Sequence, residues 1–339
     1  MTQQARSSPQ RRVEGLPRIT LTRKLMPEVE QRMQDLFDPV FNVDDHKMSR
    51  DELIEAMRTS DVLVPCVTDR IDAEMLAAAG DRLGLIASFG AGVDHIDLVA
   101  AHDRQVIVTN TPGVFTEDTA DITMALILVA PRRIGQGIRL FAAGKWEGWA
   151  PSAMLGHRIG GKRLAIVGMG RIGQAVAHRA RAFGLEIVYH NRHRLPEALE
   201  NMLGARYEPD LDKMIAEADI LSLNCPSTPE TRCLLNARRI ALMKPDSYVI
   251  NTARGELIEE DALFEALRAE RIAGAGLDVF RHEPDVDPRL LDLPNVTALP
   301  HLASATMEGR SAAGMKVVAN IQVWTDGHRP PDQVLHGLV

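Results

Sequence analysis

Short apolar runs alternate with helical patterns from about Ile19 to Val108. Strands that alternate with helices form βαβ units, so this order predicts a parallel sheet covered by helices. One helix start is clearly marked, because Ser49 stands three residues before Glu52 in the pattern of a capping box. We expect strands at 19–21, 40–43, 62–64, 83–87 and 106–108, and helices at 27–36, after 49 and at 72–79.

The stretch from Thr116 to about Ala143 has a different pattern, since the run TADITMALILVAPRR is apolar on nearly every face. A helix without a polar face is normally buried. The pattern therefore predicts one long interdomain helix over 116–143.

A second series of alternating strands and helices begins at Lys162. Its strands are expected at 163–167, 186–189, 220–223, 247–251, 274–278 and 296–298. A last helix is expected at about 304–324, followed by the polar, proline-containing tail GHRPPDQ. Two such series predict an α/β fold of two Rossmann-like or flavodoxin-like lobes with parallel sheets.

A glycine motif opens the second series. Residues 164–173 read LAIVGMGRIG, which places Gly168, Gly170 and Gly173 between an apolar strand and a helix. The first glycine permits a tight turn, the second the approach of a pyrophosphate, and the third close packing of helix on strand. The N–H groups at the helix start then bind the pyrophosphate. The segment predicts a dinucleotide site that also includes Met169, Arg171 and Ile172.

The residue at the end of the next strand indicates the type of dinucleotide. An acidic residue near this point accepts a hydrogen bond from the ribose 2′-OH of NAD. Here Asn191 stands 21 residues after Gly170, and Arg192, His193 and Arg194 follow it. A carboxylate would repel a 2′-phosphate, whereas an amide and two guanidiniums bind one. We predict NADP(H) over NAD(H); the alternative is a solvated basic loop that accepts either cofactor.

The charge balance excludes some partners. The 339 residues suit about two domains and carry 39 Lys+Arg against 46 Asp+Glu, a net charge of −7. An acidic protein is a poor partner for nucleic acid or an anionic membrane, because phosphate binding needs clustered cations. The balance hides a local cationic cluster of Arg171, Arg192 and Arg194. It therefore excludes nucleic acid but not a nucleotide.

Cysteines and apolar stretches exclude other classes. Cys66, Cys225 and Cys233 form no C-x-x-C pair and predict neither a disulfide framework nor a metal site. The longest apolar stretch, 124–130, is far shorter than the roughly 18 residues of a membrane span. The N-terminal run MTQQARSSPQRR lacks the apolar core of a secretory signal, so we expect a frayed tail and a cytoplasmic protein.

Three polar residues follow strands of the second series. Arg254 comes after VINTA, Glu283 a few residues after GLDV, and His301 after NVTALP. In open α/β sheets, ligands bind beyond the carboxyl ends of the strands. The three side chains are therefore candidates for one site, although their spacing alone does not identify a reaction.

Over nearly its whole length the chain resembles the D-isomer-specific 2-hydroxyacid dehydrogenase family. The resemblance rests on VGMGRIG (167–173), NCPSTPET (224–231), MKPDSYVINTARGELIEEDAL (243–263), AGLDVFRHEP (275–284) and LPHLASAT (299–306). Within the family, NTPGVFTEDTADITMALIL (110–128) and KWEGW (145–149) are most similar to the glyoxylate/hydroxypyruvate reductase branch. The run at 191–194 is similar to NADPH-preferring members of that branch.

The resemblance implies a role for each of the three residues. His301 would protonate the keto oxygen as hydride arrives from the nicotinamide. Glu283 would hydrogen-bond the other ring nitrogen, hold its orientation and raise its pKa. Arg254 would bind the substrate carboxylate and polarise the carbonyl.

Further contacts follow from the same resemblance. The segment SFGAGVDHID (88–97) matches the family's substrate loop, in which the amides of Ala91 and Gly92 would bind the carboxylate. Ser304 would also contact substrate. The implied cofactor contacts beyond the glycine motif are Cys225, Pro226, Thr231, Thr252, Ala253, Asp278 and Ala303.

The resemblance also implies an organisation. Residues 1–108 and 305–339 would form a discontinuous substrate domain. The inserted NAD(P)-binding domain, 109–304, would include the long helix. A homodimer is expected. Trp146 and Trp149 are expected to be packing residues; the alternative is that Trp149 or a neighbour reaches the partner's substrate site, with the helix near 116–130 helping to build the interface.

The function implied is that of an NADPH-preferring reductase of glyoxylate and hydroxypyruvate. Related enzymes for 2-ketogluconate, phenylpyruvate, phosphoglycerate or phosphite are alternatives. A phosphoglycerate enzyme often carries a C-terminal regulatory domain, for which little chain follows Trp324. A formate enzyme lacks the glutamate. A nucleotide-sensing binding protein is a further alternative, disfavoured by the complete set of Arg254, Glu283 and His301.

Overall fold

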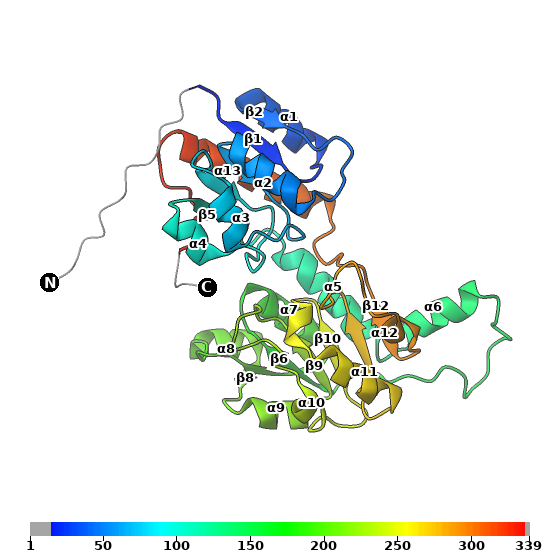
Figure 1. Ribbon diagram of the computed structural model, residues 1–339. Coiled ribbons are helices and arrows are strands. Elements are labelled where there is room, and N and C mark those ends of the chain that lie inside the picture. The colour runs from blue at the N-terminus through cyan, green and yellow to red at the C-terminus, as the bar shows by residue number, and fades with distance from the viewer. Residues whose placement is uncertain (1–14, 336–339) are drawn as a thin grey trace. The chain divides into compact units, whose positions relative to one another are not determined.

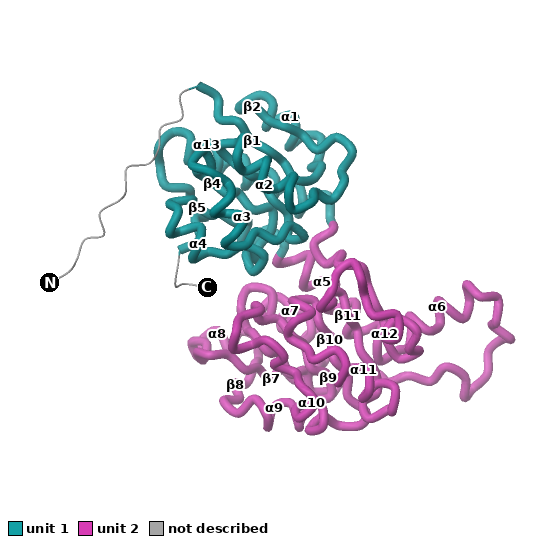
Figure 2. Tube along the Cα trace, in the orientation of Figure 1, with its two compact units in different colours: residues 1–115, 306–339 teal, residues 116–305 magenta. Residues whose placement is uncertain are grey.

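The computed structural model describes residues 15–335, which form two compact units (Figures 1 and 2). Unit 1 contains the described residues up to Phe115 and those from Thr306 onward, and unit 2 contains Thr116–Ala305. The expected N-terminal tail lies outside the described residues. No helix within 15–335 has the length and apolarity needed to cross a bilayer.

Unit 1 is built on a five-stranded parallel sheet in the order β2-β1-β3-β4-β5. Helices cover both faces, because successive strand residues point to opposite sides. Ile19 and Val62 pack on the face that contacts Ile321, whereas Leu63 and Ile86 pack on the other. The elements are β1 (Arg18–Leu21), α1 (Pro27–Leu36), β2 (Asp38–Val40), α2 (Arg50–Thr59), β3 (Val62–Val64), α3 (Ala73–Ala78), β4 (Leu85–Ala87), α4 (Leu98–Asp103), β5 (Ile107–Thr109) and α13 (Met307–Thr325).

Most predicted elements of unit 1 are confirmed, including the capping box at the start of α2, where Ser49 and Glu52 bond reciprocally. The strand predicted at 40–43 is wrong, since β2 ends at Val40. Residues 41–43 form no further strand pairs, and the Asn42 amide instead donates to the carbonyls of Thr22 (2.7 Å) and His46 (2.8 Å).

Unit 2 is built on a seven-stranded parallel sheet in the order β12-β11-β10-β9-β6-β7-β8. The strands that follow β6 are added first on one side of it, as β7 and β8, and then on the other, as β9 to β12, so the order reverses between β6 and β9. Ligands of doubly wound sheets bind at such a switch point. Its elements are α5 (Thr116–Val129), α6 (Ile134–Ala142), β6 (Arg163–Val167), α7 (Arg171–Ala182), β7 (Glu186–His190), α8 (Glu197–Leu203), β8 (Ala205–Tyr207), α9 (Leu211–Glu217), β9 (Ile220–Leu223), α10 (Ala237–Ile240), β10 (Tyr248–Asn251), η1 (Gly255–Leu257), α11 (Glu260–Arg268), β11 (Gly274–Leu277), α12 (Pro288–Asp292) and β12 (Val296–Ala298).

The single helix predicted over 116–143 is wrong, because α5 and α6 are separate helices. Pro131 stands in the break and has no N–H with which to continue the helical hydrogen bonds. Arg133, the residue before α6, has a left-handed backbone with φ +55°. The chain therefore changes direction between α5 and α6.

The division between the units falls later along the chain than predicted. Residues 109–115 belong to unit 1, where Thr111 N–H donates to Gly90 O (2.9 Å) and the Phe115 ring contacts Phe89. Ala305 falls in unit 2 instead of unit 1. The predicted tail at 327–333 also departs from expectation, since Val334 N–H donates to Val108 O (2.8 Å) and Gln333 bridges Thr109.

Candidate active site

The glycine motif lies in the turn between β6 and α7, and its backbone explains the residue types. Gly168 has φ +98°, and a Cβ there would lie 2.6 Å from the backbone nitrogen of Cys225. A Cβ on Gly173 would lie 2.2 Å from Gly168 O. A Cβ added to Gly170, by contrast, would have no other heavy atom within 4 Å. The first and third glycines are thus required by packing, and the second leaves room for an incoming group.

The start of α7 fits a dinucleotide pyrophosphate. The helix has 12 residues and begins at Arg171, and its N-cap, Gly170, supplies no side-chain acceptor for the first N–H groups. The N–H of Met169 is bound by Asn191 Oδ1 at 2.8 Å, which ties the loop to the end of β7. Free N–H groups and the helix dipole favour an anion here, so the residues present suit the predicted cofactor.

The basic run after β7 is divided between two environments. Arg194 pairs with the buried carboxylate of Glu200 at 2.7 Å. Arg192 is exposed and forms no hydrogen bond or ion pair with any residue in the part of the chain that the structure describes. Of the two arginines predicted to hold a 2′-phosphate, Arg192 is therefore the one whose guanidinium is not occupied by an internal carboxylate.

The other predicted cofactor residues lie at strand ends along the same sheet edge. Cys225 and Pro226 follow β9, and Thr231 Oγ1 donates to Pro226 O (2.7 Å), which closes that turn. Burial raises the pKa of the Cys225 thiol to about 11, so the thiol is neutral at physiological pH. Thr252 and Ala253 follow β10, where Thr252 Oγ1 lies 2.7 Å from Thr123 Oγ1 of α5.

Arg254, Glu283 and His301 follow three neighbouring strands. β10, β11 and β12 pair in parallel, so their carboxyl ends meet at one edge. A close backbone approach draws the first two segments together, since a Cβ on Gly255 would lie 2.0 Å from the carbonyl carbon of Phe280. The structure thus brings together the segments that carry the three predicted catalytic residues.

The histidine and the glutamate form a hydrogen-bonded pair. His301 Nδ1 lies 2.6 Å from Glu283 Oε2, and Glu283 Oε1 accepts the N–H of Phe280 at 2.8 Å. Burial raises the pKa of Glu283, but the hydrogen bonds from His301 and Phe280 and the charge of Arg254 outweigh it, so the pKa lies below its ordinary value. Glu283 is therefore a carboxylate that binds the Nδ1 side of the ring, and Nε2 is the ring nitrogen that this pair leaves unbound.

Asp278 holds the loop that carries His301. Its fully buried carboxylate accepts the N–H groups of Leu302 (2.8 Å) and Ala303 (2.9 Å), and its carbonyl accepts that of His301 (2.9 Å). These bonds stabilise a left-handed backbone at His301, φ +51°, which is uncommon for a residue other than glycine. Asp278 was expected to contact the cofactor, and sequence reasoning did not reveal this second task. Ser304 follows in the same loop.

The predicted substrate loop lies in unit 1, after β4. The backbone N–H groups of Ala91 and Gly92 have no hydrogen-bond acceptor among residues 15–335. Two consecutive unpaired N–H groups are a common way to bind an anion.

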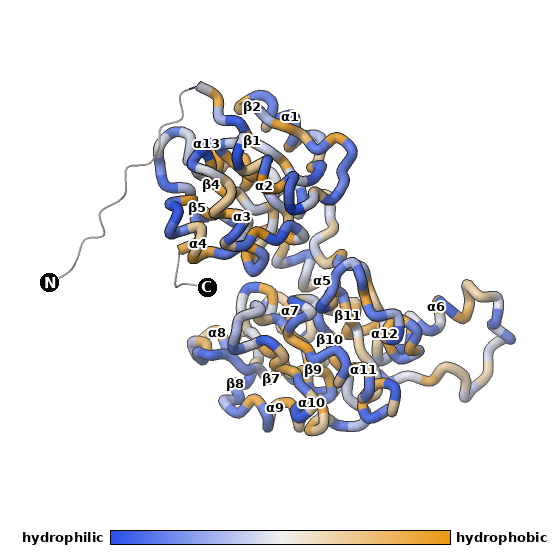
Figure 3. The backbone as a smooth tube through the Cα atoms, in the orientation of Figure 1, coloured by the Kyte–Doolittle hydropathy of each residue, from blue (hydrophilic) through white to orange (hydrophobic). Residues whose placement is uncertain are grey.

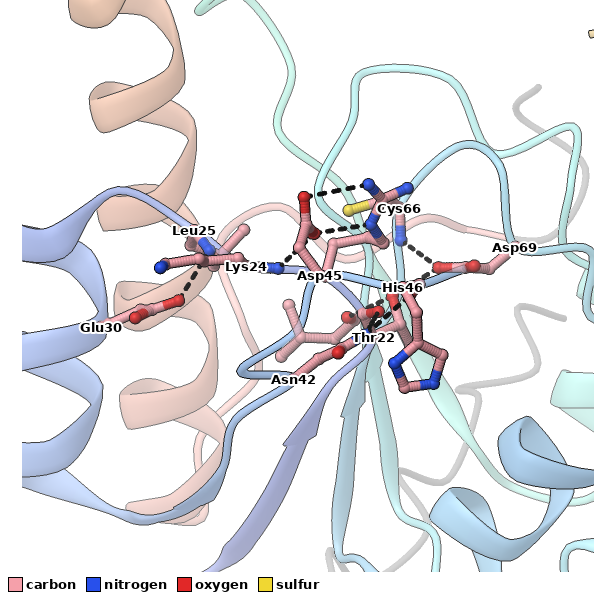
Figure 4. Close-up of polar contacts among 11 residues, drawn as sticks. Thr22, Lys24, Leu25, Glu30, Asn42, Asp45, His46, Cys66 and Asp69 are labelled. Carbon is pink, nitrogen blue, oxygen red and sulfur yellow. Dashed lines mark hydrogen bonds and ion pairs between the residues drawn. The ribbon is translucent and has the colours of Figure 1, made fainter. Parts of the chain in front are cut away.

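A polar network braces the same sheet edge at β1 and β3 (Figure 4). Asp69 Oδ2 accepts Thr22 Oγ1 (2.5 Å) and the N–H of Cys66 (2.8 Å), and Arg23 pairs with Asp45 at 2.8 Å. The backbone of Cys66 in turn forms an isolated parallel β-bridge with Phe89, at the start of the substrate loop. The network, which sequence reasoning missed, ties three loops to one edge.

Comparison with known proteins gives consistent matches. Residues 124–303 match the model of the D-isomer specific 2-hydroxyacid dehydrogenase NAD binding domain. The glyoxylate reductase of Thermococcus litoralis is 40% identical over 322 residues, which are 94% of this chain and 96% of that protein.

Two solved structures extend the comparison. A D-isomer specific 2-hydroxyacid dehydrogenase of a Polaromonas species has a TM-score of 0.88 and 39% identity, and covers 95% of this chain and 100% of its own. The NADPH-dependent glyoxylate/hydroxypyruvate reductase of Sinorhizobium meliloti was solved with NADP and malonate. It has a TM-score of 0.84 and 34% identity, and the match covers 94% of this chain and 97% of that one.

These matches extend over most of the chain and agree with the glycine motif and the strand-end residues of unit 2. This protein therefore belongs to the D-isomer specific 2-hydroxyacid dehydrogenase family and is an NAD(P)-dependent oxidoreductase.

Proposed function

We propose that this protein reduces glyoxylate and hydroxypyruvate to the corresponding 2-hydroxy acids, of the D configuration where the product is chiral, and that it prefers NADPH. The observation that carries the proposal is the pair of Glu283 and His301, 2.6 Å apart, at the strand ends of a sheet that also bears a dinucleotide motif. The reductases of Thermococcus litoralis and Sinorhizobium meliloti support the substrate class.

In this proposal each residue has one task. The glycine motif and Arg192 hold the cofactor, which when bound supplies the hydride. Arg254 and the N–H groups of Ala91 and Gly92 bind the substrate carboxylate, with Ser304 nearby in the loop after β12. His301 donates its Nε2 proton to the keto oxygen, so that the developing alkoxide is neutralised as it forms. Glu283 holds the ring and stabilises its cationic form.

A substrate panel assayed with both cofactors tests the function. We expect the highest kcat/KM for glyoxylate and hydroxypyruvate with NADPH. A higher kcat/KM for 2-ketogluconate, phenylpyruvate, 3-phosphoglycerate or phosphite would show that the proposed substrate is wrong. The protein would still be a 2-hydroxyacid dehydrogenase-type oxidoreductase. Cofactor binding without turnover of any of these compounds would instead favour a nucleotide-sensing role.

Replacing Arg192 with Ser is expected to lower kcat/KM for NADPH about tenfold and to leave the value for NADH almost unchanged, because one charge-assisted hydrogen bond to the 2′-phosphate is lost. Steady-state kinetics at saturating glyoxylate measures both values. Arg268→Ser, on the exposed surface of α11, is the matched control. An equal change for both cofactors would contradict the assignment.

We also propose a homodimer formed through an arm of unit 2, defined as residues 134–158. Among its apolar side chains, Ile138 is 64%, Phe141 70% and Trp149 84% exposed, and α6 buries none of its residues. Figures 1 and 3 show α6 and the segment after it extending away from the other elements of unit 2, with hydrophobic residues along this path. Arg139 donates to the carbonyls of Leu293, Pro294 and Val296, which holds α6 against the start of β12. A concentrated apolar surface of this kind favours a protein partner, and a second copy would bring Trp149 to the partner's substrate site.

Ile138→Asp combined with Phe141→Asp is expected to convert a dimer to a monomer, because each carboxylate would be buried without a partner. Light scattering after size-exclusion chromatography measures the mass. Met202→Asp on α8, a methionine that is 63% exposed, is the control. A wild-type monomer, or a double variant that stays dimeric, would contradict the proposal.

A further inference from the structure

The predicted substrate loop is held by the residues that follow β5. Thr111 N–H donates to Gly90 O at 2.9 Å, and the side-chain amide of Asn110 donates to Ala91 O at 2.7 Å. The start of the loop is fixed by the sheet, since Ser88 N–H donates to Thr109 O. Among these contacts, the one from Asn110 is made by a side chain and can be removed by substitution.

These two bonds determine where the loop's own donors point. A trans peptide is planar, and its C=O and N–H groups point in opposite directions. Gly90 O and Ala91 O both point toward the segment at 110–111, so the N–H groups of Ala91 and Gly92 point away from it. Neither N–H has an acceptor within the described residues. The contacts of Asn110 and Thr111 thus create a pair of parallel donors suited to a carboxylate.

Asn110 is itself held by a distant part of the chain. Its N–H donates to Asp332 O at 3.3 Å. The Asp332 carboxylate accepts Lys316 Nζ (2.9 Å) and Asn320 Nδ2 (3.1 Å), both from α13. The Asp332 N–H in turn donates to Asn320 Oδ1 (3.1 Å). Asp332, which lies in the predicted polar tail, is therefore bound to α13 and to the backbone of Asn110.

We propose that Asn110 is a positioning residue for the substrate, which orients the Ala91–Gly92 peptide so that its donors face the substrate carboxylate, and that Asp332 steadies Asn110. This inference rests on the proposed function of Ala91 and Gly92 as carboxylate ligands. It assigns a task in substrate binding to two residues that touch neither the cofactor nor the reacting atoms.

The test compares Asn110→Ala and Asn110→Asp with wild type. Both lack the amide donor, and the aspartate adds a charge that repels Ala91 O. We expect KM for glyoxylate to rise about tenfold in the alanine variant and further in the aspartate variant, with a smaller change in kcat and no change in KM for NADPH. Asp332→Ala is expected to change KM for glyoxylate in the same direction by a smaller factor.

Asn295→Ala is the matched control, because Asn295 Nδ2 donates to Leu267 O at 3.1 Å in the same kind of bond, at the amino end of β12. It should lower the Tm without changing KM for glyoxylate. A role that is only structural would lower the Tm of the Asn110 variants and leave KM at the wild-type value, and that result would overturn the inference.

Failure of the proposed function would look different. If wild type reduced no keto acid, calorimetry with oxalate and cofactor would replace the kinetic assay. Weaker oxalate binding by Asn110→Asp than by Asn295→Ala would then keep the inference, and equal binding would overturn it.

Discussion

Replacing His301 with Ala is expected to lower kcat for glyoxylate reduction by about 10² to 10⁴, which is the usual contribution of a positioned general acid. The reason is local, because the imidazole is the group that Glu283 holds at 2.6 Å and that we propose protonates the keto oxygen. Stopped-flow oxidation of NADPH under single-turnover conditions isolates this step from product release. Cofactor affinity, followed by nicotinamide fluorescence, should stay near the wild-type value.

His282→Ala is the control for that experiment. His282 is exposed and adjoins Glu283 in the sequence, so its loss should leave kcat near normal. Near-normal turnover by the His301 variant would show that the histidine is not the general acid, whichever substrate the enzyme prefers.

Replacing Glu283 with Gln is expected to lower kcat about 10²-fold, because the amide neither stabilises the cationic ring nor fixes its orientation as the carboxylate does. Steady-state kinetics with glyoxylate and NADPH measures kcat for both proteins. A normal kcat in the variant would show that the pair is not functional.

The lowered pKa of Glu283 predicts how the stability of the fold depends on pH on the acid side. A carboxyl group whose pKa is lower in the folded than in the unfolded state binds fewer protons when folded, so it stabilises the fold above the ordinary glutamate pKa of about 4.3. That contribution is lost as pH falls through the lowered value. The contribution of Glu283 to stability should therefore be complete above about pH 5, and a series of thermal unfolding curves at falling pH measures its loss.

The sequence predicts those features that depend on local packing or chemistry. The glycine positions of the dinucleotide motif are one example, since a Cβ at Gly168 or Gly173 would collide with backbone. The Ser49–Glu52 capping box is another, because both of its hydrogen bonds join residues three apart. Most strand positions in both sheets follow from short apolar runs, which are typical of parallel strands buried on both faces.

Features that depend on contacts between distant residues are not readable in this way. The pairing of Arg194 with Glu200 removes one of two apparently equivalent arginines from the predicted cofactor site, and no spacing indicates which. The sequence does not predict β8, because the three residues of Ala205–Tyr207 are too few for their apolar–polar alternation to stand out, and the strand forms by pairing with β7. Asn110 stands within a motif that resembles the family, but its amide acquires a task only when Ala91 is brought beside it.

The break between α5 and α6 has a different cause. The apolar run continues through 130 and predicts a continuous buried helix, whereas Pro131, directly after the run, ends the helical hydrogen bonding. The consequence is functional, because the break separates a buried helix from the exposed arm that we propose forms the dimer.

The most direct test of the central claim is the configuration of the product. Purified protein incubated with hydroxypyruvate and NADPH should yield glycerate of the D configuration, with one NADPH oxidised for each glycerate formed, as resolved by chiral chromatography. Formation of L-glycerate, or oxidation of NADPH without glycerate, would contradict the account.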